Sequence, residues 1–186
     1  LMKHAKKGSN KNLSYIMRFG MTVLTVILIV LFFSIMIMVG QIQGTARIVN
    51  YAGFVRGGTQ RMVKLENAGQ PQDKMCGTIA SYINGLQNGS DELNFVRLDD
   101  NAFQNKMVEL DEYFQKLTQE IDLVREKGYE NTDIISMSEK FFHICDEATG
   151  LAEDYSQKKA TSLDRLEKIV IVDIVGLIIL IAGELI

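Results

Sequence analysis

Residues 21–39 read MTVLTVILIVLFFSIMIMV and contain no charged side chain. As a helix, this stretch is roughly 28 Å long, close to the thickness of the hydrocarbon layer of a bilayer. A core helix of a soluble protein rarely runs this long without a charge. A cleaved signal peptide would have a shorter apolar region that ends in small residues, which residues 35–39 do not supply. The stretch therefore predicts a transmembrane helix over residues 19–40.

A second apolar run, IVIVDIVGLIILIAGELI, occupies residues 169–186 and is just long enough to span a bilayer. Its two acids, Asp173 and Glu184, stand near its start and its end. We expect each to lie near a membrane interface, because a carboxylate in mid-bilayer is costly without a partner. The run predicts a second transmembrane helix. A cytoplasmic output module is then expected beyond it, missing from residues 1–186.

Charge predicts the orientation of the chain. Residues 1–18 carry five Lys and Arg and no acid, so the positive-inside rule places them in the cytoplasm. Residues 41–168 carry 15 Lys and Arg against 21 Asp and Glu, a balance that excludes nucleic acid as a partner. The chain is therefore expected to be a multi-pass protein of the cell inner (plasma) membrane, with residues 41–168 extracytoplasmic.

The extracytoplasmic segment is predicted to be helical. Its one proline, Pro71, permits long helices, and apolar residues recur at alternating spacings of three and four. Asp99 or Asp100 is expected to cap a helix that ends at Gly128. The stripe of that helix is Phe103, Met107, Leu110, Phe114, Leu117, Ile121 and Val124. The stripe of the next helix is Ile134, Met137, Phe141, Ile144, Ala148, Leu151 and Tyr155.

Two earlier helices have weaker patterns. One stripe, bracketed by Pro71 and a turn at residues 88–90, is Met75, Ile79, Tyr82 and Leu86. The other is Ile48, Ala52, Val55, Thr59 and Met62. Its helix also contains Gly53, Gly57 and Gly58, for which close helix approach is one reason. Four helices joined by short loops predict an all-α fold, an antiparallel four-helix bundle between two transmembrane helices.

Signs of catalysis are poor in this segment. His143 stands alone, and one His with two separated Cys does not make a zinc site, so we expect no metal, no cofactor and no catalytic residue. Cys76 and Cys145 lie in a compartment that could oxidise them. Their estimated heights above the membrane are similar, which allows a disulfide. Two free thiols beside core positions are the other interpretation.

The segment RIVNYAGFVRGGTQRMVKLE, residues 47–66, contains Asn50, Gly53, Arg56 and Arg61 in an N-x-x-G-x-x-R-x-x-x-x-R arrangement. With Ala52, this run resembles the periplasmic "P box" of nitrate/nitrite sensor kinases and type IV pili chemotaxis transducers. The resemblance covers about twenty residues just after the first span. It implies a homodimer that pairs through this helix, with Arg56 binding a small anion at the interface and Arg61 as the second motif arginine.

The physical properties of Arg56 leave two interpretations open. Arg56 lies on a largely apolar stripe, where a guanidinium is costly to bury unless it is paired. Its fork suits a planar oxyanion, and it equally suits an ion pair with one of the bundle's acids. Gly57 and Gly58 depart from the family pattern beside it, which leaves the nature of the ligand open.

These patterns together favour the sensor region of a bacterial transmembrane signalling receptor. It would bind a small-molecule or anion ligand and pass the signal to a kinase, a chemoreceptor module or a diguanylate cyclase. An enzyme is not expected in this segment. The alternative is a non-sensory membrane scaffold whose helical bundle mediates assembly. The sequence beyond residue 186 would discriminate the two.

Overall fold

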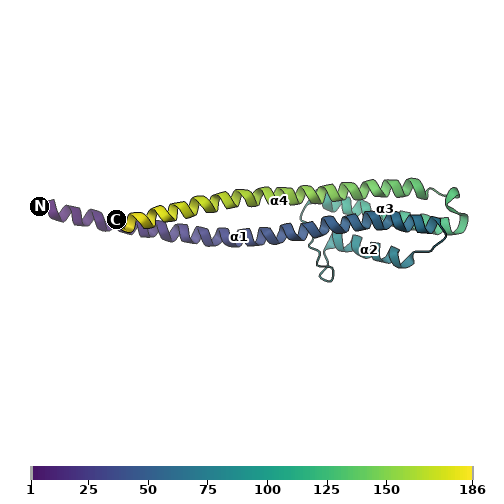
Figure 1. Cartoon of the computed structure of the whole chain (residues 1–186), viewed down its shortest axis with the longest axis horizontal. Helices are drawn as coiled ribbons and strands as arrows, with labels where there is room; N and C mark the ends of the chain where they lie inside the picture. Colours follow the sequence, from purple (N-terminus) through teal and green to yellow (C-terminus); the bar gives the residue numbers. More distant parts are fainter. Residues whose placement is uncertain (1, 186) are drawn as a thin grey trace. The chain divides into compact units, whose positions relative to one another are not determined.

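The chain is almost entirely helical in the computed structural model, which describes residues 2–185 and the side chains of residues 12–185. Its helices are α1 (Met2–Asn67), α2 (Asp73–Asn88), α3 (Asn101–Lys127), the short η1 (Tyr129–Asn131) and α4 (Ile134–Leu185) (Figure 1). No strand occurs among the described residues, where Ser90 and Phe95 form only an isolated bridge. The prediction of an all-α protein is confirmed.

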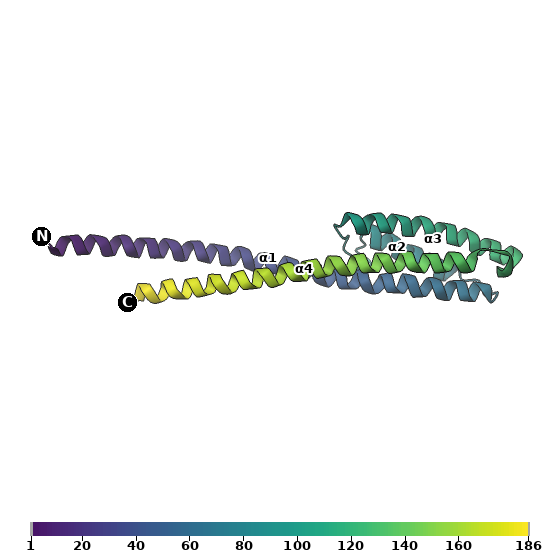
Figure 2. The same ribbon diagram turned by 90° about the horizontal axis from the view of Figure 1, so that it is seen from above.

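The chain divides into two compact units. The core unit is Gln41–Lys158, and the end unit combines Leu1–Gly40 with Lys159–Ile186. Within the core unit, Figures 1 and 2 show the four helical segments side by side, and successive segments reverse direction along the chain. All four segments contribute side chains to one hydrophobic core.

The two strongest predicted stripes are in this core. All seven predicted residues of α3 are buried, from Phe103 to Val124. On α4, the predicted residues are buried or packed against the core. The predicted start of α3 is also confirmed, because the Asp100 carboxylate accepts a hydrogen bond from the Phe103 backbone N–H at 2.9 Å. Gly128, with φ 79°, follows the end of α3.

The weaker stripes of α1 and α2 also face the core, with help from a loop that the periodicity did not indicate. Phe95 and Leu98, between α2 and α3, are buried. The Phe95 backbone exchanges hydrogen bonds with Ser90, at 3.0 and 2.8 Å, which folds the loop back onto α2. A Cβ at Gly85 would lie 2.9 Å from the Phe95 ring, so this close approach requires glycine.

Within one chain, Gly53, Gly57 and Gly58 make no close helix contact, so their expected role in helix approach stays a prediction. No other side chain comes within 4 Å of a Cβ built at Gly53 or Gly57, and at Gly58 the nearest atom, from Ile79, is at an ordinary 3.5 Å. The tight contact is at Gly44, where a Cβ would lie 2.6 Å from a Val96 methyl group. Within one chain, the surface at Gly53 and Gly57 is open.

The end unit pairs the first part of α1 with the last part of α4. Gly20 packs against Leu180 and Gly176 against Leu24, which places the two segments in contact. Asp173 lies in this seam with 6% exposure, and its Oδ2 has no hydrogen-bond partner. The Asp173 carboxylate therefore lies in the contact between the two helices, and its place at a membrane interface stays a prediction.

Only one helix of the described chain, α1, is long and apolar enough to cross a membrane. Its most apolar window has a mean hydropathy of 3.0, and none of that window is buried by the rest of the chain. The end of α4 carries two acids, Asp173 and Glu184, within its apolar sequence. The second transmembrane helix therefore stays a prediction.

Candidate ligand-binding site

Arg56 extends from α1 toward α4. Its guanidinium donates to the carboxylate of Asp146 and lies over the ring of Phe142, 5.1 Å from the centroid. The Arg56 side chain is 35% exposed, so it is only partly buried. Of the two interpretations of Arg56, the structure contains the ion pair with an acid of another helix. An anion that bound Arg56 would have to compete with Asp146.

The other motif residues lie on a different side of α1. Arg61 follows Arg56 by five residues, which turns it by about 140° around the helix axis. Asn50 and Arg61 are exposed, Gly53 is half-buried, and the Phe54 ring between them is 56% exposed. These positions share one face with Gly57. We call Asn50, Gly53, Phe54, Gly57 and Arg61 the open face of α1.

Charge distinguishes the two motif arginines further. Arg61 forms no ion pair with any side chain of the described residues, whereas Arg56 does. The structure thus separates the four residues predicted for the ligand site. Asn50, Gly53 and Arg61 share the open face, and Arg56 faces α4.

The two cysteines are free thiols, in place of the disulfide that their estimated heights allowed. Cys145 is buried on α4, where Arg56 and Asp146 are its charged neighbours, and burial raises its pKa to about 12. Cys76 is half-buried on α2 beside Asp73, and its pKa is raised first by burial. Cys76 lies in the first turn of α2, at the end of the core unit where α4 begins. Cys145 lies several turns further along α4 from its start at Ile134, so the two thiols stand at different heights.

A buried ion pair joins three helices near Cys76, and no sequence pattern predicted it. The Glu66 side chain, 2% exposed, accepts hydrogen bonds from two nitrogens of Arg125 at 2.9 and 2.6 Å. It also accepts from the Gln72 backbone N–H at 2.7 Å, and Arg125 donates to Asp73 at 2.8 Å. The hydrogen bonds that Arg125 donates, first to Glu66 and then to Asp73, raise the pKa of Arg125. This cluster fastens the end of α1 to α2 and α3.

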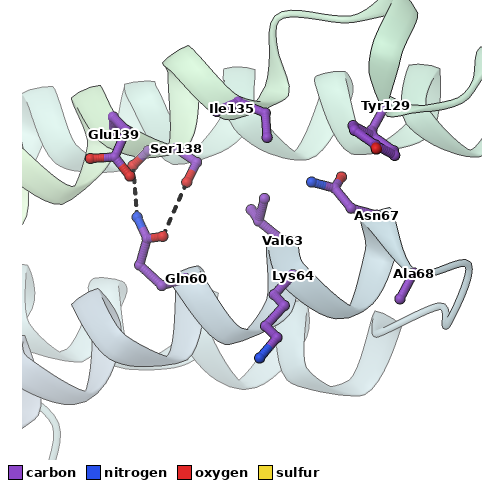
Figure 3. A pocket seen from close by; sticks show the side chains of 9 residues that line it. All are labelled: Gln60, Val63, Lys64, Asn67, Ala68, Tyr129, Ile135, Ser138 and Glu139. Atoms are coloured by element: carbon purple, nitrogen blue, oxygen red, sulfur yellow. Dashed lines mark hydrogen bonds between the residues drawn. The ribbon is translucent and has the colours of Figure 1, made fainter.

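A pocket of about 440 Å³ lies between α1 and α4 at the same end of the core unit. Figure 3 shows the side chains of Val63 and Ile135 facing each other across it, with the Asn67 amide below the Tyr129 ring. Gln60 and Ser138 close one side with two mutual hydrogen bonds, of 3.1 and 3.3 Å (Figure 3). Apolar periodicity in the sequence did not predict this pocket. The pocket depends on how η1 turns the chain between α3 and α4, which has no periodic pattern.

Comparison with known proteins gives no relative: no family model, no curated protein and no solved structure matches this chain. Among the described residues, no three His, Cys, Asp or Glu side chains come together as a metal site. The Asp100 carboxylate is occupied as the cap of α3. The geometry therefore offers two places for a ligand, the open face of α1 and the pocket between α1 and α4.

Proposed function

We propose that the chain is the extracytoplasmic sensor region, with its membrane helices, of a bacterial transmembrane signalling receptor. One observation carries this proposal. Both α1 and α4 are single uninterrupted helices whose residues belong to both compact units. A helix that packs in a folded core and continues into an apolar segment can transmit a small displacement along its axis. A scaffold that only mediates assembly has no need for two such helices.

The proposed membrane topology is a hairpin of two spans. The first span is the apolar part of α1, and the second is the end of α4. In the end unit, Arg18 donates to Glu184 at 2.8 Å, and Ser14 donates to the same carboxylate at 2.7 Å. This pairing supplies the partner that an acid at the end of a span needs. It also supports placing residue 184 at the cytoplasmic interface, with the basic N-terminal segment.

The proposed extracytoplasmic domain is an antiparallel four-helix bundle. The alternating directions of the four segments and their single shared core support this architecture. Such a bundle returns the chain to the side on which it began, which two membrane spans require.

The proposed active form is a homodimer that pairs through the open face of α1. Gly53 and Gly57 leave room for a second helix, and the Phe54 ring is an apolar group that a partner would remove from water. Arg61 would then approach its counterpart in the partner chain. Two guanidiniums repel, and an oxyanion bound between them would replace repulsion with charge-assisted hydrogen bonds. The anion would therefore favour one dimer arrangement over another, as a switch requires.

Cysteine cross-linking on the full chain in membranes tests this function. In a background with Cys76→Ser and Cys145→Ala, we expect Gly57→Cys to form a cross-linked dimer rapidly on oxidation. Val108→Cys, an exposed position on α3, serves as the matched control and should stay monomeric. Nitrate, sulfate or another small oxyanion should change the Gly57→Cys rate, and Arg61→Ala should abolish that change, whereas Arg97→Ala should not. A dimer that forms at Gly57 but responds to no ligand would favour the scaffold.

A further inference from the structure

The loop between α2 and α3 is fixed at both of its ends. We call residues 89–98 of this loop the strap. Near its start, the backbones of Ser90 and Phe95 exchange two hydrogen bonds, of 3.0 and 2.8 Å. At its end, Leu98 is 2% exposed, and its carbonyl accepts a hydrogen bond from the Gln104 side chain at 2.9 Å. The strap is therefore an ordered segment that moves as a unit.

One contact fits the strap to α1. A Cβ built at Gly44 would lie 2.6 Å from one methyl carbon of Val96 and 3.2 Å from the other. Carbon atoms in ordinary contact are about 3.5–4.0 Å apart, so Val96 occupies space that only a glycine leaves open. Branching at Cβ restricts the χ1 torsion of valine, which favours moving the strap over turning the side chain. We call the contact of Val96 with Gly44 the notch.

Aromatic rings connect the strap to the open face of α1. The Phe95 ring packs edge-on against Tyr51 with 4.6 Å between the centroids, and Tyr51 packs edge-on against Phe54 at 5.4 Å. Phe95 is buried, whereas Phe54 is the exposed apolar residue of the open face. A partner that packed on Phe54 would therefore contact one end of a row of three rings, and the strap holds the other end.

We propose that the strap is a conformational lock on α1. With Val96 in the notch, α1 stays at one position along the bundle. An axial shift by one residue, about 1.5 Å, moves Gly44 away from Val96, and both neighbours of Gly44 carry a Cβ. Rearrangement of a dimer at Phe54 releases the lock through Tyr51 and Phe95. This release rests on the proposed function, whereas the lock itself does not.

Thermal unfolding of the full chain in detergent micelles tests the lock. Gly77, an exposed glycine within α2 whose built Cβ has no atom within 4 Å, is the matched control. Gly77→Ala should raise Tm by a few degrees, because alanine favours a helix more than glycine does. Gly44→Ala should lower Tm instead. In a Val96→Ala background, which lacks both methyl groups, Gly44→Ala should raise Tm as Gly77→Ala does. An equal rise with and without Val96 would overturn the lock.

A disulfide provides a second measurement that does not depend on stability. The built Cβ of Gly44 lies 3.5 Å from the Val96 Cβ, within the range of about 3.5–4.5 Å found in disulfides. In the Cys76→Ser, Cys145→Ala background, Gly44→Cys with Val96→Cys should form an internal bridge on mild oxidation. Gly77→Cys with Val96→Cys should form none. If the Gly44 pair stays reduced, Val96 does not occupy the notch.

Hydrogen exchange of the Ser90 and Phe95 amides measures the release. We expect a small oxyanion that changes the Gly57→Cys cross-linking rate also to speed this exchange, by about tenfold. Tyr51→Leu should abolish the faster exchange and keep the cross-linking response, whereas Tyr113→Leu, on α3, should keep both. A cross-linking response without faster exchange in the wild type would overturn the release. If no oxyanion changes the cross-linking rate, the proposed function fails, and the melts and the disulfide still decide whether the lock exists.

Discussion

At the scale of single residues, charge placement decides which side chains are available to a ligand. Arg56 is engaged with Asp146 and Phe142, while Arg61 remains on the open face without an ion pair among the described residues. Both arginines belong to the same sequence motif, but five residues of helix separate their directions. A motif in a helix therefore gives the residue types of a site, and the packing of neighbouring helices decides which of them face it.

The Glu66–Arg125 pair gives the first prediction. Arg125→Ala leaves the Glu66 carboxylate buried without its guanidinium, and breaking one side of a buried pair costs about 3 kcal/mol. Circular-dichroism melts of the full chain should show a clearly lowered Tm. The control, Arg97→Ala, removes an exposed arginine and should change Tm little. If Arg125→Ala unfolds like Arg97→Ala, the cluster does not fasten the helix ends.

The buried thiol of Cys145 gives the second prediction. Burial raises the pKa of Cys145 from 9.0 to about 12, so above pH 9 the folded chain keeps a proton that the unfolded chain releases. Stability contributed by the neutral thiol is complete below pH 9 and falls as pH rises from there. Cys145→Ala should melt below wild type at pH 7, and the gap should narrow steadily between pH 9 and 11. A gap that stays constant over this range would contradict the buried, protonated state.

At the scale of elements, apolar periodicity was sufficient to predict the core residues of any helix that has one buried side. Every predicted core position of α3 is buried, because a spacing of three and four residues repeats along one face of a helix. Phe95 and Leu98 were missed because their burial depends on a loop that folds back, which has no period. The tight contact of Gly44 with Val96 was missed as well, since an open surface and a tight contact look alike in sequence.

The third prediction concerns this core. Phe114 and Phe141 are buried on α3 and α4, with ring centroids 5.7 Å apart. Phe114→Ala or Phe141→Ala should each destabilise the chain by roughly 3–5 kcal/mol, because the cavity left behind adds to the lost burial. Val108→Ala, at an exposed position of α3, should cost less than about 0.5 kcal/mol. A loss of less than about 1 kcal/mol for either phenylalanine would mean that its stripe faces something other than this core.

At the scale of the whole molecule, the proposed function depends on which parts of the chain lie on which side of a membrane. The all-α class was predictable from the heptad stripes, and the nineteen uncharged residues predicted the one helix of the described chain that is long and apolar enough to cross a membrane. The second span stays a prediction, and Asp173 and Glu184 interrupt its apolar sequence. Their surroundings, a helix seam for Asp173 and the pair with Arg18 for Glu184, become visible only in three dimensions.

Labelling of single cysteines with a membrane-impermeant maleimide in intact cells tests the proposed two-span topology. In the Cys76→Ser, Cys145→Ala background, the reporters are Asn12→Cys, Val108→Cys and a cysteine appended after residue 186. The account predicts that Val108→Cys reacts in cells whose outer barrier is permeable. The other two should react only after the inner membrane is opened. Labelling of all three from the same side, or of the appended cysteine together with Val108→Cys, would contradict the two-span topology.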